Sequence, residues 1–286
     1  MRPIAAAILS VFGREFAKCS RMRRVALPLI ALALVVATER SAQAQACHGD
    51  VLDPGAASRF TATVSTIAGS FDRAQGKGDY EGIHAALKVQ AGGARWGIFL
   101  PAYRLSRNGS TAVGLGDVGV RAEVPFVSLF DRALEIGVGI GATLPTGSSS
   151  DELGMGHTMA MPWLFGSLRL GIVNAEVEAG SAHALADHVH SIAPAGEHVH
   201  TARPVVDPMN ANELWASAAA SVPFGFVQLV PTLRGARPIG DGETRMNAGL
   251  GLRLPIGPIS AAAGAELPVV GDAFTWRGYL RGTLSF

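Results

Sequence analysis

The sequence has few charged residues, only two cysteines and no long apolar run. Asp, Glu, Lys and Arg make up 16% of its 286 residues, well below the quarter that is usual in soluble domains. The net charge of +1 leaves no basic excess, which argues against a nucleic-acid partner. No stretch reaches about 18 apolar residues, so the sequence predicts no helical membrane span.

The N-terminal region has the pattern of a secretory signal peptide. Three arginines precede the apolar run VALPLIALALVVA, and small residues follow it. This order predicts a signal peptide over residues 1–46, with Met22 as an alternative start and 47–58 as a short N-terminal segment. Cys19 then lies in the removed part, so no intrachain disulfide is expected. Cys47 becomes the first mature residue, and its lipidation stays open.

After residue 58 the sequence alternates with period two, which is typical of strands whose two faces differ. In ALEIGVGIGAT, the apolar side chains share one face, whereas Glu135, three glycines and Thr143 share the other. In FTWRGYLRGTLSF, Phe274, Trp276 and Leu280 share a face opposite Arg277 and Arg281. The pattern predicts twelve strands, at about 59–69, 80–91, 94–104, 114–126, 133–144, 157–169, 172–182, 212–222, 226–237, 243–254, 259–267 and 274–286.

The links between these strands alternate in length. Five short turns alternate with six longer loops, among them LSRNGSTAV at 105–113. A soluble sandwich or barrel would carry a charged exterior. Here the apolar face is continuous, which favours an all-β, antiparallel transmembrane β-barrel of about 12 strands over 59–286. A barrel must close, because an open edge in lipid leaves amide groups without partners.

The C-terminal Phe286 ends the last alternating strand. It resembles the signal by which the barrel assembly machinery of Gram-negative bacteria recognises outer-membrane proteins. The expected location is therefore the cell outer membrane, with outer-membrane lipid and that machinery as partners.

Two short motifs go beyond a generic barrel. GLGDVGVRAEVPF at 114–126 is followed by ATLPTGSSSDELGMG at 142–156. A GxGD strand and an LPTG turn in this order resemble the meta-pathway phenol degradation-like family of outer-membrane barrels. The resemblance implies passage of small, often apolar or aromatic molecules, and it transfers no catalytic residue. Strand ends and tight turns also explain the glycines and proline of both motifs.

If the apolar face meets lipid, the opposite face lines the lumen. Its charges form ion pairs that fill the interior, or they line a wet channel; the sequence leaves both open. The predicted pore-lining residues are Lys88, Asp117, Arg121, Glu123, Glu135, Glu176, Arg234, Arg245, Arg253, Arg277 and Arg281, and Glu178 and Glu266 share this face.

The longest predicted loop, 183–211, contains DHVHSIAPAGEHVH. His-x-His in an extended chain places both rings on one side. The candidate metal ligands are His188, His190, His198 and His200, with Asp187 and Glu197. Imidazole with carboxylate suits zinc, copper(II) or nickel, and the absence of a nearby cysteine argues against copper(I) here. A pH response and a plain solvated loop are the alternatives.

These patterns favour an outer-membrane barrel that passively conducts or takes up a small solute, without catalysis and without an obligatory cofactor. No nucleophile and base are placed together convincingly. A surface metal-binding barrel that uses the histidine loop is the second hypothesis. An outer-membrane enzyme and a structural barrel are the third and fourth.

Overall fold

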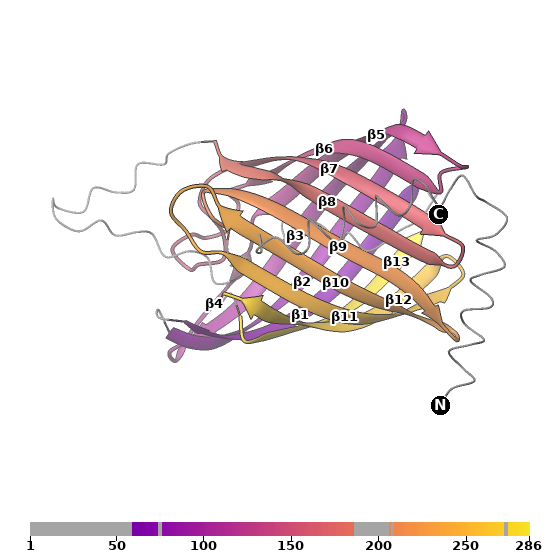
Figure 1. Cartoon of the computed structure of the whole chain (residues 1–286). Helices are drawn as coiled ribbons and strands as arrows, with labels where there is room; N and C mark the ends of the chain where they lie inside the picture. The colour runs from indigo at the N-terminus through magenta and orange to yellow at the C-terminus, as the bar shows by residue number, and fades with distance from the viewer. Residues whose placement is uncertain (1–58, 74–75, 186–205, 207–208, 272–273) are drawn as a thin grey trace. The chain divides into compact units, whose positions relative to one another are not determined.

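A computed structural model describes residues 59–73, 76–185, 206, 209–271 and 274–286. They form one antiparallel sheet whose strands follow one another around a closed ring (Figure 1). Among the described residues, no helix is long and apolar enough to cross a membrane. The strands are β1 (Phe60–Arg73), β2 (Gly76–Ala91), β3 (Ala94–Arg107), β4 (Ser110–Leu115), β5 (Val118–Leu129), β6 (Leu134–Leu144), β7 (Met159–Leu170), β8 (Val173–Ala184), β9 (Asn212–Phe224), β10 (Val227–Pro238), β11 (Arg245–Ile256), β12 (Ile259–Val270) and β13 (Trp276–Ser285).

The segments β4 and β5 occupy one position in the wall. Both pair with β3, β4 along residues 102–107 and β5 along residues 95–99. The thirteen segments therefore build a barrel of twelve strand positions, closed where β1 pairs with β13. The predicted fold class is confirmed. The predicted signal peptide and the segment 47–58 lie outside the described residues.

The two faces of the wall differ as the period-two pattern predicts. On β6, Glu135 is buried inside the ring, whereas Val138 and Ile140 are 45% and 60% exposed on the outside. Leu250 and Leu280 continue this apolar exterior on β11 and β13. So much exposed apolar surface requires a nonaqueous surrounding, and closure leaves no open edge to face lipid. This is the geometry of a transmembrane β-barrel.

The stretch LSRNGSTAV consists of two strand ends joined by a tight turn, so the prediction of a long loop there was wrong. β3 runs to Arg107 and β4 starts at Ser110, so only Asn108 and Gly109 form the link. Their φ angles of 50° and 83° are both positive. Asn-Gly is the pair that adopts such hairpin turns readily, because neither residue resists the left-handed region.

The end of the chain contains a second correction. Phe274 was predicted to share the apolar outer face, but it is 2% exposed, and the Arg277 guanidinium lies 4.8 Å from its ring centroid. Phe274 precedes β13, so strand alternation does not fix its direction. Phe286 is exposed, stacks on Phe60 at 5.6 Å and exchanges backbone hydrogen bonds with it. Its role in assembly stays a prediction.

The middle of the lumen side of β6 has glycines that lie beneath large side chains of β7. Gly137 pairs with Phe165 and Gly139 with Trp163 across the two strands. A Cβ atom on either glycine would overlap the neighbouring ring. The repeated glycines of IGVGIGA therefore provide room for aromatic rings that lie flat against the wall.

We expect Gly139→Ala to lower the free energy of unfolding by about 1–3 kcal/mol, because the added methyl group forces the Trp163 ring away from the wall. Urea titration of the barrel in lipid vesicles measures the change. Gly282→Ala on β13 is the matched control, since no atom lies within 4 Å of its added Cβ. An equal loss for both variants would show that the ring contact is unimportant.

Candidate functional site

Arg121 is the centre of an ion-pair network on the lumen wall. It projects from β5 and pairs with Glu123 on its own strand and with Glu178 on β8, the latter at 2.9 Å. Gly97 on β3 leaves room for the stem of this side chain, and its guanidinium lies 4.7 Å from the centroid of the Trp163 ring on β7. Cation–π contact and two carboxylates together hold this buried arginine in place.

Arg95 extends the network towards the short-turn end. It forms ion pairs with Glu135 on β6 and, at 3.8 Å, with Glu123 on β5. Its guanidinium also lies 5.5 Å from the Phe165 ring centroid. Carboxylates and guanidinium groups thus alternate along this network of ion pairs, in the order Glu135, Arg95, Glu123, Arg121 and Glu178.

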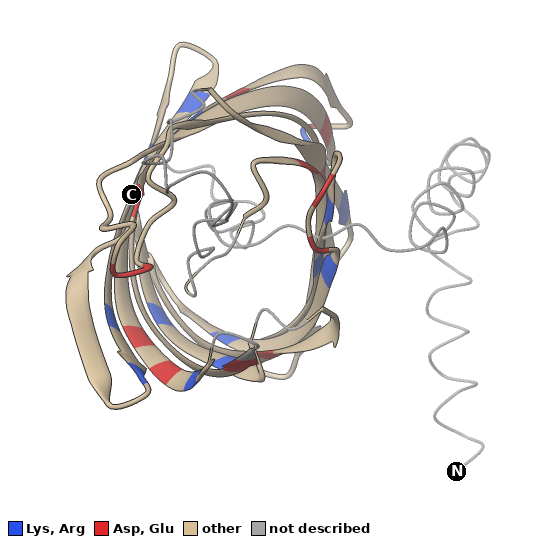
Figure 2. Cartoon of the chain, turned by 90° about the vertical axis from the view of Figure 1, so that its left-hand side faces the viewer, with Lys and Arg blue, Asp and Glu red and all other residues tan. Residues whose placement is uncertain are grey.

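A second network lies on β10, β12 and β13. Glu266 pairs with Arg277 on the neighbouring strand and with Arg234 at 3.8 Å. Further along β13, the Arg281 guanidinium lies 5.0 Å from the Tyr279 ring centroid. Figure 2 shows charged segments of both signs around the wall of the ring. In this second network, basic side chains outnumber acidic ones.

At the loop end of the barrel, Glu213 and Arg245 form a pair that is closed off from solvent. Their exposed fractions are 0% and 1%, and the Arg245 Nη2 to Glu213 Oε2 distance is 2.7 Å. Asn210 donates two further hydrogen bonds to the same carboxylate oxygen, from its backbone N–H and its side-chain amide. Asn210 also bonds the backbone of Glu243, which joins the segment before β9 to the β10–β11 loop.

The GxGD and LPTG motifs lie against each other. The buried Asp117 carboxylate accepts the backbone N–H of Gly147 at 3.0 Å and that of Met155 at 2.6 Å. The Thr146 hydroxyl donates to the Gly116 carbonyl and accepts the Val118 N–H, both at 2.9 Å. Gly116 and Asp117, between β4 and β5, thus bind both ends of the loop that joins β6 to β7.

That loop, residues 145–158, is called the inner loop because it packs against the lumen side of the wall. Leu153 is 2% exposed and lies in an apolar cluster with lumen-facing side chains of β1, β2 and β3, including Tyr80 and Tyr103. Glu152 forms an ion pair with Arg107 on β3, with N–O distances of 2.5 and 2.6 Å. The inner loop therefore narrows the lumen near its loop end.

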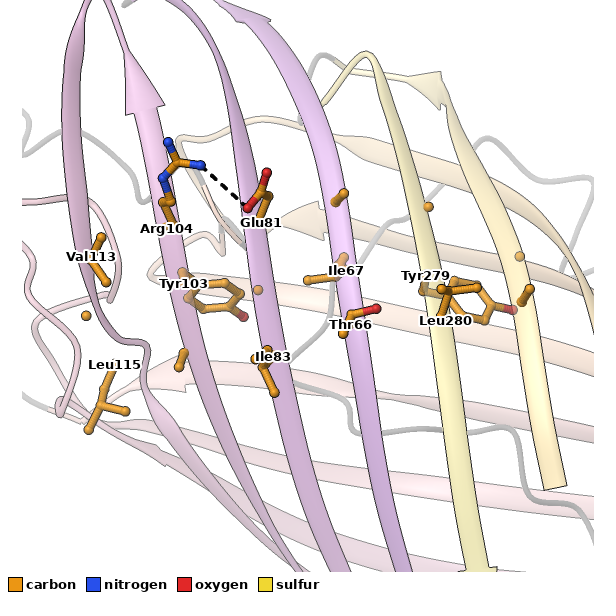
Figure 3. Close-up of a pocket in the computed structure, with 17 residues that line it drawn as sticks. Thr66, Ile67, Glu81, Ile83, Tyr103, Arg104, Val113, Leu115, Tyr279 and Leu280 are labelled. Atoms are coloured by element: carbon orange, nitrogen blue, oxygen red, sulfur yellow. Dashed lines mark ion pairs between the residues drawn. The ribbon is translucent and has the colours of Figure 1, made fainter. Parts of the chain in front are cut away.

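A hollow of about 960 Å³ lies along β12, β13, β1, β2, β3 and β4 (Figure 3). The exposed members of its lining, Val113, Ile83 and Leu280, belong to the apolar outer surface. Glu81 and Arg104 form an exposed ion pair at its edge, 3.6 Å apart. An apolar hollow on this face would lie against acyl chains in a membrane.

The structure assigns different surroundings to the predicted pore-lining residues. The residues of the ion-pair networks at the middle and short-turn end of the wall are Arg121, Glu123, Glu135, Arg234 and Arg277. Lys88, Glu176, Arg253 and Arg281 share the lumen-facing register and are partly buried. Asp117 holds the inner loop instead, and Arg245 exposes almost no surface. Pore lining stays a prediction for the whole set.

The predicted metal ligands cannot be placed. Asp187, His188, His190, Glu197, His198 and His200 lie outside the described residues, so the zinc or copper(II) site stays a prediction. His183 is described, and its ring bonds Asn212 and Ser181. Within the described part of the chain, no three His, Cys, Asp or Glu residues are grouped so that they could hold a metal ion.

Sequence reasoning missed three participants: Arg95, Glu213 and Trp163. Arg95 lies on the same lumen face as Gly97 and Phe99, and this alternation could have assigned it. Glu213 shares the lumen face of β9 with Trp215 and Ser217 in the same way. For Trp163 the signal was indirect, since it faces the glycine positions of β6 only once the strands are paired.

Comparisons with known proteins show the fold. No protein-family model and no curated protein sequence matches the chain. An outer-membrane channel from Pseudomonas putida F1 has a similar solved structure, with a TM-score of 0.58 and 13% identity over 83% of this chain and 99% of that one. The NanC porin is also similar, with a TM-score of 0.51 and 10% identity over 79% and 99%. The chain thus has the fold of outer-membrane β-barrels.

Proposed function

We propose that the protein lies in the outer membrane and lets a small solute cross by passive diffusion, without a chemical step. The observation that supports this most is the contrast between the two faces of the closed ring. An apolar exterior suits lipid, whereas charged and aromatic side chains line the interior along its length. A barrel of twelve strands is wider than the eight-stranded barrels that side chains fill, which is consistent with a passage.

The charges divide the lumen into two arcs. The strands β10–β13 present Arg234, Arg253, Arg277 and Arg281 against Glu266, apart from the closed Arg245 pair. The strands β5–β8 present Glu123, Glu135, Glu176 and Glu178 around Arg121, with Arg132 and Arg169 at the turn end. In a ring of twelve positions these arcs lie opposite each other. Lys88 and Arg95 add positive charge, so the wall as a whole favours anions.

Aromatic rings lie between the charges on the lumen side. His84 contacts Phe99 edge-on at 5.0 Å between centroids, and Tyr279 stacks with Arg281. A solute with a flat apolar part and a carboxylate would match both kinds of surface. We propose small aromatic carboxylates as its class, in line with the resemblance of the GxGD and LPTG motifs to the phenol degradation-like family.

The ion preference of the pore tests this proposal. In a salt gradient across a planar bilayer, we expect a reversal potential that reports preference for chloride or benzoate over potassium. The double variant Arg253→Gln/Arg281→Gln should shift that potential towards cation preference, because it removes two lumen charges. Glu123→Gln should shift it the other way, because it removes a negative lumen charge.

The matched control is Arg237→Gln, since Arg237 is exposed at the loop end of β10 and directed away from the lumen. It should leave the reversal potential unchanged. If the pores conduct but the lumen variants leave the reversal potential unchanged, the proposed solute class is refuted. Absence of conduction in the folded protein would refute the channel itself.

A further inference from the structure

Possible metal ligands, thioethers and one imidazole, recur with period two at the end of the inner loop and the start of β7. The sequence GMGHTMAM contains Met155, His157, Met159 and Met161. On an extended chain, such spacing directs side chains to the same side. Met159 and Met161 face the lumen and are 0% and 2% exposed. The Nε2 atom of His157 lies 3.1 Å from the Met159 sulfur.

A third segment brings another thioether to the same place. Met209, just before β9, is 1% exposed and belongs to the buried cluster that contains Met159 and Met161. Met155 packs against this cluster. The rings of Trp163 and Trp215, 6.1 Å apart between centroids, close its other side. Three separate parts of the chain thus contribute methionine and tryptophan side chains to one buried cluster, and His157 contacts it through Met159.

The chemistry of this cluster selects the kind of ion. Thioethers are soft ligands, and they favour copper(I) over zinc, calcium or magnesium. Typical metal distances of about 2.0 Å to imidazole nitrogen and 2.3 Å to sulfur are compatible with two donors 3.1 Å apart. Asp117 adds a negative charge beside the site, since its carboxylate accepts the Met155 N–H. Methionines also fill gaps in ordinary cores, but the imidazole nitrogen in contact with sulfur is not needed for packing.

We propose that His157 and Met159, together with Met161 and Met209, bind one soft monovalent metal ion, copper(I) or silver(I). The site is separate from the histidine loop, whose imidazoles and carboxylates suit harder divalent ions. It does not depend on the proposed solute passage.

The experiment titrates the full refolded chain in detergent with copper(I), using a chromogenic copper(I) chelator as competitor. We expect one ion to bind, with quenching of tryptophan fluorescence. His157→Gln and Met159→Leu should each weaken binding at least about tenfold, since each removes one donor. Met246→Leu is the matched control, because Met246 lies on the outer face of β11 and should not change affinity.

Two further measurements make the result decisive. Met161→Leu provides a second thioether variant, and heat-dependent migration on gels shows which variants are folded. A variant with His188, His190, His198 and His200 changed to Ala should still bind copper(I) with unchanged affinity. If that variant loses the ion, or if the folded thioether variants retain full affinity, the proposal is overturned.

Discussion

Asp117→Ala is expected to release the inner loop and to increase the conductance of the barrel several-fold. The substitution leaves the partly buried N–H groups of Gly147 and Met155 without their carboxylate acceptor. Hydrogen bonds to charged groups contribute about 1.5–3 kcal/mol each, and unsatisfied buried donors add a desolvation cost. The attachment of the inner loop to the wall then loses about 3–5 kcal/mol of stabilising free energy. A single apolar contact, such as that of Leu153, cannot offset this loss.

Three measurements check this result. Single-channel current reports the widened lumen, and urea titration reports the lost stability. A glutamate-specific protease should cleave after Glu152 only when the loop has left the wall, because Glu152 is 6% exposed. Asp151→Ala is the control, since this exposed carboxylate of the same loop contacts only Ser148 among the hydrogen bonds that the structure gives it. Unchanged current and protection in Asp117→Ala would show that Asp117 does not hold the loop.

Glu213→Ala should lower the free energy of unfolding by about 3–5 kcal/mol, because it leaves the Arg245 guanidinium buried without its carboxylate. Asn210 loses its acceptor at the same time. The hydrogen bonds between Asn210 and the Glu243 backbone remain, so the loss comes from the buried guanidinium and the Asn210 donors. Urea titration in lipid vesicles, followed by tryptophan fluorescence, measures the change.

The exposed pair Glu81–Arg104 provides the matched control. Both side chains are more than half exposed, so Glu81→Ala should cost at most about 1 kcal/mol. The double variant Glu213→Leu/Arg245→Met should regain much of the lost stability, because it removes both buried charges together. Equal losses for Glu81→Ala and Glu213→Ala would contradict the importance of burial.

The faces of the strands could be predicted from the sequence, because a membrane wall imposes one simple rule. Each residue faces either lipid or lumen, so Glu135 and Ile140 are assigned by counting from one another. The same rule placed Arg121, Glu178 and Arg277 inside before any pairing was known. Glycines on the lumen face of β6 were visible too, although the rings that lie over them were not.

The contacts between loops could not be predicted, because periodicity ends where strands end. Asp117 was expected to line a pore, and only the three-dimensional arrangement shows that its carboxylate holds Gly147 and Met155. Phe274 turns inward because it precedes β13 and meets Arg277 there. The Asn108–Gly109 turn could have been predicted from the Asn-Gly pair, but a long loop was assumed there instead.

Current through a planar bilayer tests most directly whether this barrel conducts. The purified full chain, shown to be folded by heat-dependent gel migration, is added to one side in symmetric potassium chloride. We expect discrete current steps of uniform size, with larger steps for Asp117→Ala than for Asp151→Ala. Folded protein that inserts into vesicles yet gives neither current steps nor solute-driven vesicle swelling would contradict this expectation.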